Sequence, residues 1–316
     1  MGKRSRNAGQ HSPAPPAPQK GAAGFEAYYQ RAWNTRWAAL KQALLSPPVR
    51  TARVNAFADH NTVGLHLTEA RPLDLVPGCF QLPTDTIPDD EKFTPGRDAQ
   101  QLLSSYVMDP ASVLAARQVD VAESSRVLDL CAAPGGKSLI LAERFAAHGQ
   151  LVLNDRSPLR RKRLLQVLKD YVPEAVRARI RVHAHDGRLW GKREALAYDA
   201  ILLDAPCSSE QHVLRDVKEL ALWSPKRIQR LSRDQLSLLR SAFAALRPGG
   251  LLIYCTCALA DDENDGVIEE LLRRDPSAQV APLQLPIGEP TRYGWHILPD
   301  KTGFGPLFIA RLNKSS

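Results

Sequence analysis

Short apolar runs alternate with longer polar segments from residue 106 onward, and this alternation limits the fold more than any other feature. The runs cover residues 126–131, 150–155, 180–184, 200–204 and 250–255. The segments between them show the helical spacing of apolar residues. Strands that alternate with helices predict a doubly wound α/β fold with a mostly parallel sheet. Residues 303–312 predict one further strand around a Gly-Pro step.

The first 105 residues differ in character from the rest. Residues 1–24 are rich in Pro, Ala, Gly and Lys and contain no acid, which predicts a disordered basic tail. Over residues 25–44, large apolar side chains recur every three or four positions, which predicts a helix that stops at a proline pair. An irregular region follows, with strand-like runs such as residues 62–67. We therefore predict three parts: a tail (1–24), a small N-terminal helical extension (25–105) and an α/β domain (106–316).

The net charge of +8 predicts a polyanionic partner such as nucleic acid. Four of these charges lie in the tail, on Lys3, Arg4, Arg6 and Lys20. Further clusters lie at residues 160–163 and at Lys226, Arg227, Arg230 and Arg233. Solvated helix faces would explain any one cluster equally well. The charge therefore permits nucleic-acid binding without proving it.

Neither the chain start nor its apolar stretches predict a membrane anchor. No stretch approaches the roughly 18 apolar residues that cross a bilayer, and no hydrophobic segment follows the polar start. We expect a cytoplasmic protein. A mitochondrial location is the alternative for a eukaryotic chain, because the first 24 residues lack acids, although their prolines disfavour an amphipathic helix.

The five cysteines fit neither a disulfide scaffold nor a structural metal site. They lack CxxC spacing and a neighbouring histidine cluster, so we expect no bound metal. Packing as a small hydrophobe suffices for Cys79 and Cys255, and for Cys131 apart from its backbone. Thiol chemistry is the stronger interpretation for Cys207 and Cys257, which follow apolar runs into loops.

The loop after the first run, residues 131–137, combines small residues with two adjacent glycines. In a doubly wound fold, ligands bind beyond the carboxyl ends of the strands, where glycines let a ligand approach the backbone. A triphosphate-binding loop would need glycine in place of Cys131, and a dinucleotide-binding loop would need GxGxxG, so both patterns fail. S-adenosylmethionine carries no phosphate and needs neither pattern, which makes it the predicted cofactor.

Acids at the ends of later runs fit the other needs of that cofactor. Asp155 ends the second run about 20 residues after the glycines, where a carboxylate is expected to bond ribose hydroxyls. Asp186, after the third run, could bond the adenine amino group. Either acid could instead cap the helix that follows it. Three such acids, counting Asp204 after the fourth run, favour cofactor binding.

The fourth and fifth runs lead into Cys207 and Cys257, which would meet at the cofactor's edge if the two strands are neighbours. A thiolate that adds to carbon 6 of cytosine makes carbon 5 a nucleophile toward the methyl sulfonium. A base must afterwards remove the carbon-5 proton, so two thiols can divide addition and release. Asp204 could bond the cytosine ring, and Lys137 could orient a thiol or lower its pKa.

With these residues assembled, the chain resembles the Nop/Sun (RsmB-like) family of S-adenosylmethionine-dependent RNA cytosine-5 methyltransferases. The resemblance is carried by residues 129–137 (DLCAAPGGK), 154–155, 186–187, 204–208 (DAPCS) and 256–257, in the family's order. It implies a class I methyltransferase, Rossmann-like fold, with Cys257 as nucleophile and Cys207 as the group that assists release. It also implies cofactor contacts from Cys131, Ala132, Ala133, Pro134, Gly135, Gly136, Lys137, Asp155, Arg160, Asp186 and Asp204.

The resemblance implies a structured RNA substrate, with rRNA preferred and tRNA as the alternative. Residues 160–163, Lys226, Arg227 and the tail would then contact phosphates, and residues 25–105 could contribute to RNA contact. The target base would have to leave its stack to reach the thiols. We expect a monomer, which a protein that delivers the RNA could assist.

The chain departs from the family after the release cysteine. Many members continue through glycines, whereas residues 208–212 read SSEQH, which is similar to the subgroup that contains the mitochondrial members. Two other functions are weighed against RNA methylation. DNA cytosine methylation would use the Pro206-Cys207 dipeptide and leave Cys257 unused. A non-catalytic RNA-binding assembly factor with this fold is disfavoured because both cysteines and the loop glycines are intact.

Overall fold

The computed structural model describes residues 20–60, 70–83, 95–120, 122, 125–145 and 149–315. The part of the predicted tail before residue 20 and the strand-like run at residues 62–67 lie outside the described residues. The basic side chains of Lys3, Arg4 and Arg6 lie outside them too.

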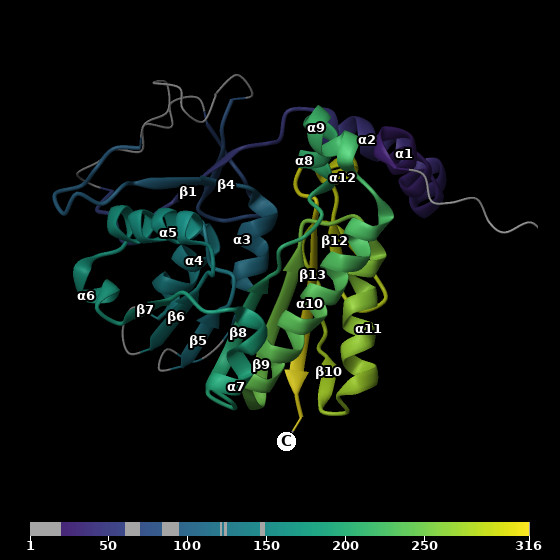
Figure 1. Cartoon of the computed structure of the whole chain (residues 1–316). Coiled ribbons are helices and arrows are strands. Elements are labelled where there is room, and N and C mark those ends of the chain that lie inside the picture. Colours follow the sequence, from purple (N-terminus) through teal and green to yellow (C-terminus); the bar gives the residue numbers. More distant parts are fainter. Residues whose placement is uncertain are drawn as a thin grey trace, which may run out of the picture.

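The predicted doubly wound sheet is present (Figure 1). Its centre consists of parallel strands in the order β9-β8-β5-β6-β7. Antiparallel strands extend it beyond β9 in the order β13-β12-β11, and β10 also pairs with β13. The antiparallel edge is larger than the sequence predicts. The strands are β5 Arg126–Asp129, β6 Gln150–Asn154, β7 Ile180–His183, β8 Tyr198–Asp204, β9 Leu246–Thr256, β10 Ala278–Val280, β11 Glu289–Pro290, β12 Trp295–Ile297 and β13 Leu307–Lys314.

Helices cover both faces of this sheet, which buries both sets of strand side chains. In β8, Ala200 and Leu202 belong to one core, and Ile201 and Leu203 belong to the other. Burial on both faces explains why the strands read as continuous apolar runs. Helices α3 (Pro110–Arg117), α4 (Gly136–Arg144) and α5 (Pro158–Tyr171) cover the first face, and α7 (Trp190–Arg193), α10 (Pro225–Ala245) and α11 (Asp265–Arg274) cover the second.

The predicted N-terminal helix is a pair of helices, α1 (Gly21–Trp33) and α2 (Trp37–Leu45). Asn34 separates them with a φ of 48°, a conformation that asparagine tolerates better than most residues. Because α1 begins at Gly21, the boundary predicted after residue 24 falls inside a helix. Phe25, Tyr29 and Trp37 pack with Trp223 in a third core. The apolar side chains of α1 and α2 therefore pack against the α/β domain near the ends of β8 and β9.

A small antiparallel sheet with the order β2-β3-β1-β4 lies where we predicted an irregular region. Its strands are too short for a two-residue period to be recognised in the sequence. Arg53 in this sheet forms two 2.8 Å hydrogen bonds to Glu143 in α4. The predicted boundary at residue 106 falls inside its last strand. The strands are β1 Thr51–Val54, β2 Arg71–Pro72, β3 Cys79–Gln81 and β4 Ser105–Met108.

Candidate active site

The loop after β5 lies where the order of the sheet reverses. The chain moves outward through β6 and β7 and then returns to place β8 on the other side of β5. Ligands of doubly wound folds bind at this point. Gly135 has a φ of 121°, and a Cβ there would lie 3.0 Å from Val167. A Cβ on Gly136 would lie 2.8 Å from Tyr106. Both glycines are therefore required by the close approach of neighbouring elements.

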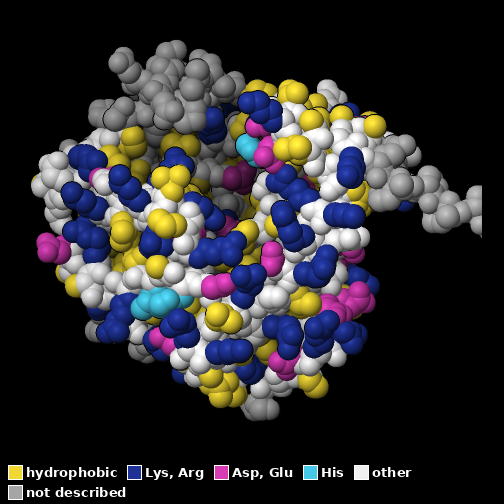
Figure 2. All heavy atoms as spheres, in the orientation of Figure 1, with side chains coloured by type: hydrophobic (Ala, Val, Ile, Leu, Met, Phe, Trp, Pro, Cys, Tyr) yellow, Lys and Arg dark blue, Asp and Glu magenta, His cyan; other side chains and the backbone are white. Residues whose placement is uncertain are grey.

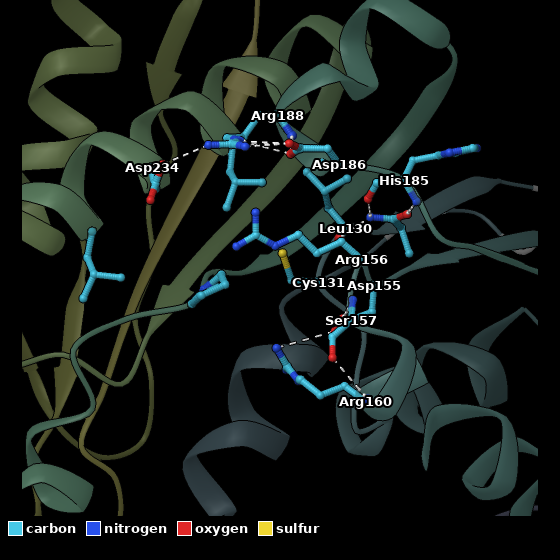
Figure 3. Close-up of a pocket in the computed structure, with 15 residues that line it drawn as sticks. Leu130, Cys131, Asp155, Arg156, Ser157, Arg160, His185, Asp186, Arg188 and Asp234 are labelled. Carbon is cyan, nitrogen blue, oxygen red and sulfur yellow. Dashed lines mark hydrogen bonds and ion pairs between the residues drawn. The ribbon is translucent and has the colours of Figure 1, made fainter. Parts of the chain in front are cut away.

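A pocket of about 260 Å³ opens beside this loop (Figure 3). Asp155 lies at its wall with 4% exposure. Its Oδ1 accepts a hydrogen bond from the Ser157 backbone at 2.9 Å, whereas its Oδ2 has no hydrogen-bond partner among the described residues. The Arg160 guanidinium lies 3.5 Å from this Oδ2. A buried carboxylate oxygen without a donor fits a ligand hydroxyl.

Asp186 lines another part of the same pocket, and Arg188 holds it (Figure 3). The shortest of the Arg188 hydrogen bonds is 2.7 Å, and Arg188 also reaches Asp234 in α10 at 3.2 Å. These contacts from Arg188 lower the pKa of Asp186. Asp186 also accepts from the Arg188 backbone as the cap of the short helix η2 (Gly187–Leu189). Capping and pocket lining therefore coexist at Asp186.

Two members of the basic cluster at residues 160–163 turn toward the pocket. Arg160 donates to the Ala133 carbonyl, and Arg161 donates to the Asp155 carbonyl at 2.9 Å. The side chains of Lys162 and Arg163 are exposed. Arg161 thus supports the backbone beside the pocket, and contact of the cluster with phosphates stays a prediction.

A second pocket of about 250 Å³ lies along the same loop and shares Cys131 with the first. Lys137 and Asp204 line it, and Lys137 donates to Asp204 across 2.7 Å. Burial by itself would lower the pKa of Lys137, but Asp204 and the nearby thiols outweigh burial and raise it. Lys137 is thus a cation that bonds a carboxylate. No hydrogen bond from Lys137 to a cysteine sulfur occurs in the part of the chain that the structure describes.

Cys257 lines a third pocket of about 380 Å³, and Cys207 contacts Cys257. Strands β8 and β9 are parallel neighbours, as predicted, and the sulfur atoms of Cys207 and Cys257 lie 2.8 Å apart. This pocket shares Ser112, Lys137 and Asp204 with the second pocket. The cofactor loop and the thiols therefore open onto adjoining spaces.

The two thiols differ in acidity. The hydrogen bond from Cys207 lowers the pKa of Cys257, a bond from Ser209 adds to this effect, and burial opposes it. The same bond between the sulfurs, together with burial, raises the pKa of Cys207 well above its ordinary value. Cys257 is therefore the more acidic of the two thiols, and the thiolate is the nucleophilic form of a cysteine.

Two buried carboxylates, which the sequence did not single out, hold the loops that carry the thiols. Glu210 accepts from the Tyr29 hydroxyl at 2.5 Å and from the Leu259 backbone at 3.0 Å. Glu263 accepts from the Ser208 backbone at 3.0 Å. Burial, together with the charge of Glu210, raises the pKa of Glu263 to about 7. Through Glu210, α1 is thus hydrogen-bonded to the segments that follow Cys207 and Cys257. In the sequence, the only indication of this contact is the difference from the family at residues 208–212.

The other cysteines fit the packing interpretation. Cys79 and Cys255 lie in the first core, and burial raises the pKa of each. Burial likewise raises the pKa of Cys131. Among the described residues, no group of three or more His, Cys, Asp or Glu side chains is placed to hold a metal ion. None of the described helices is long and apolar enough to cross a bilayer.

Known proteins are similar to this chain in sequence and in architecture. The family described as 16S rRNA methyltransferase RsmB/F matches residues 116–313. The 5-cytosine rRNA methyltransferase NSUN4 of Xenopus tropicalis is 37% identical over 74% of this chain and 62% of its own length. The mitochondrial tRNA (cytosine(34)-C(5))-methyltransferase of Danio rerio is 36% identical over 66% of this chain and 60% of its own length. The chain thus spans less than two thirds of either relative.

A solved structure has the same fold at low sequence identity. NSun6 from Pyrococcus horikoshii superposes with a TM-score of 0.74 and 19% identity, covering 92% of this chain and 97% of that one. The class I methyltransferase fold predicted for residues 106–316 is confirmed by this likeness and by the strand order.

Proposed function

We propose, on the premise that this chain belongs to the 16S rRNA methyltransferase RsmB/F family, that it methylates carbon 5 of a cytosine in structured RNA. The observation that carries the proposal is the pair of sulfurs, 2.8 Å apart, at the ends of β8 and β9. The Lys137–Asp204 ion pair connects their pocket to the loop of the cofactor site. Two thiols beside such a loop fit addition to a pyrimidine ring and release from it.

Cys257, Cys207, Asp204 and Lys137 each have a place in the proposed reaction. The Cys257 thiolate forms a bond to carbon 6 of the cytosine, which places electron density on carbon 5. Asp204, held by Lys137, accepts a hydrogen bond from the cytosine amino group. Cys207, as a thiolate, accepts the carbon-5 proton. The electrons of that carbon–hydrogen bond re-form the double bond between carbons 5 and 6, and the bond between carbon 6 and Cys257 breaks, which returns the Cys257 thiolate. S-adenosylmethionine, when bound, supplies the methyl group as an electrophile.

The pocket beside the loop fits S-adenosylmethionine. The Oδ2 of Asp155, which accepts no hydrogen bond from the described residues, suits a ribose hydroxyl, and Asp186, whose pKa Arg188 lowers, suits the adenine amino group. Arg160 would border the adenosine. Residues 131–137 would contact the remainder of the cofactor through their backbone.

We expect Asp155→Ala to weaken S-adenosylmethionine binding by roughly tenfold to a hundredfold, because a hydrogen bond to a buried carboxylate contributes about 1.5–3 kcal/mol. Isothermal titration calorimetry measures the dissociation constant directly. Asp74→Ala, which removes an exposed acid outside the pockets, is the control and should bind as the parent protein does. An unchanged dissociation constant in Asp155→Ala would remove Asp155 from the cofactor site.

Basic side chains around the pockets supply the proposed RNA surface. Figure 2 shows Lys and Arg side chains spread over the face that surrounds a hollow in the molecule. In α5 and α10, the side chains of Lys162, Arg163, Lys226, Arg230 and Arg233 are exposed, whereas Arg227 is paired with Glu219. Phosphate contacts of this kind release counterions, so binding should weaken steeply with salt. Residues 25–105 are proposed to extend this surface.

The preferred substrate is rRNA, and tRNA is the alternative, because relatives named for each show similar identity to this chain. We expect purified protein to transfer labelled methyl groups to an rRNA fraction, with competition from unlabelled RNA and none from duplex DNA. Bisulfite sequencing of rRNA and tRNA from cells with and without the protein then locates the cytosine. Methylation confined to tRNA would select the alternative, and methylation of DNA would contradict the proposal.

The partner and compartment proposals follow from the same premise. We propose a monomer that acts on RNA, with a second protein needed only for RNA delivery. We propose the cytoplasm as its compartment, or the mitochondrion for a eukaryotic chain, since one relative is named as mitochondrial.

A further inference from the structure

Ser209 has an unusual backbone conformation for a serine. Its φ of 52° and ψ of 60° lie in the left-handed region, where glycine is the favoured residue. A non-glycine residue held there costs free energy and often marks a functional position. The sequence also differs at this point from many members of the family that it resembles, which have glycines here.

The side chain of Ser209 does not cap the helix that follows it, although its position predicts such a cap. Ser209 is the residue before helix α8 (Glu210–Arg215), where serine usually caps the helix with its hydroxyl. Here the side chain makes no capping hydrogen bond. Its Oγ instead lies 3.2 Å from the sulfur of Cys257 and 3.6 Å from that of Cys207. The strained backbone therefore aims the hydroxyl at the thiols.

The surroundings of Cys257 explain why a second donor matters. Burial disfavours a thiolate, and the charges of Asp204 and Glu210 disfavour it further. Lys137, the nearby cation, donates its hydrogen bond to Asp204. Within the described residues, the Cys257 sulfur lies within hydrogen-bond distance of the Cys207 sulfur and the Ser209 hydroxyl. The Cys207 contact, at 2.8 Å, has the larger effect on the Cys257 pKa, and the Ser209 hydroxyl at 3.2 Å adds a second, since a hydroxyl is a stronger donor than a thiol.

We propose that Ser209 is a further catalytic residue, whose hydroxyl donates a hydrogen bond to the Cys257 sulfur whenever that sulfur carries negative charge. Such charge is present before Cys257 adds to the ring and again when the bond to carbon 6 breaks. The hydroxyl moves no proton and forms no covalent bond. The catalytic part of this inference rests on the proposed function, which makes Cys257 the nucleophile. The hydrogen bond itself can be tested without RNA.

Two substitutions separate the hydroxyl from the backbone strain. Ser209→Gly removes the hydroxyl and relieves the left-handed strain, whereas Ser209→Ala removes the hydroxyl and keeps the strain. The pH dependence of Cys257 alkylation by iodoacetamide, read by peptide mass spectrometry, reports the pKa of this one thiol. We expect both variants to raise that pKa by about one unit, which leaves roughly tenfold less thiolate at neutral pH.

The same two variants should shift the acidic limb of the methyl-transfer pH profile to higher pH. The sign follows because loss of the donor raises the Cys257 pKa, so activity lost at neutral pH returns under alkaline conditions. Ser209→Gly should melt at the parent temperature or above it, which separates the effect from unfolding. Ser112→Ala, which removes another hydroxyl from the same pocket, should leave the Cys257 pKa unchanged.

Three outcomes decide between the inference and its rivals. An unchanged Cys257 pKa in both variants would overturn it. A shift in Ser209→Ala alone would overturn it in favour of a backbone effect. A shift in both variants, combined with full methyl transfer by Cys257→Ala, would confirm the hydrogen bond and refute the catalytic role, because the proposed nucleophile would then be wrong.

Discussion

Cys257→Ala will transfer methyl groups to RNA at least about 10⁴-fold more slowly than the parent protein, because the substitution removes the proposed nucleophile that forms the bond to carbon 6. S-adenosylmethionine binding should be unchanged, since the pocket around Asp155 and Asp186 does not include Cys257. Transfer of labelled methyl groups to RNA measures the loss, and calorimetry measures the retained cofactor binding.

Cys255→Ala is the matched control for this substitution. Cys255 lies two residues away in β9, but its side chain points into the first core and burial raises its pKa. We expect Cys255→Ala to keep methyl transfer at temperatures below its melting point. Full activity in Cys257→Ala would refute the proposed nucleophile, and equal losses in both variants would point to damage of β9 instead.

Cys207→Ala has the second large expected effect, which is a trapped intermediate. Cys257 can still add to the ring, but release is slowed, so a covalent protein–RNA adduct should accumulate and survive denaturing gel electrophoresis. Loss of the Cys207 hydrogen bond also raises the pKa of Cys257 toward its ordinary value. The yield of adduct should therefore increase as the pH rises through that pKa, up to the point where Cys257 is fully ionised.

The double variant Cys207→Ala, Cys257→Ala is the control, and it should form no adduct. An adduct that appears in Cys257→Ala and disappears in Cys207→Ala would exchange the roles of the two cysteines. That result would favour the arrangement of DNA cytosine methylation, in which the Pro-Cys dipeptide carries the nucleophile. Turnover of Cys207→Ala at the parent rate would refute its role in release.

The parts of this protein that sequence predicts well are those that depend on local pattern. The central strands were recognisable because burial on both faces makes them continuous apolar runs. The loop glycines and the strand-end acids followed from the position of each run. The meeting of Cys207 and Cys257 needed one further assumption, that their strands are neighbours, and the parallel pairing of β8 with β9 confirms it.

The parts that sequence did not predict depend on contacts between distant segments. Asp234 reaches Arg188 from a helix 46 residues farther along the chain, and Tyr29 reaches Glu210 across 181 residues. The basic cluster at residues 160–163 looked uniform, yet Arg161 turns to a backbone carbonyl. The Ser209 hydroxyl lies 3.2 Å from the Cys257 sulfur and helps to lower its pKa, and no pattern of apolar residues in the sequence indicates this contact.

The bond between Tyr29 and Glu210 has a consequence for how the active site is divided along the chain. The cofactor side is built from segments between residues 130 and 238, whereas the thiol side is also braced by a helix that begins at Gly21. A chain shortened to residues 106–316 would retain the side chains that line the first pocket and lose this brace. Cofactor affinity is therefore a poor measure of whether the thiols are correctly positioned, and we expect the shortened chain to bind the cofactor while it loses methyl transfer.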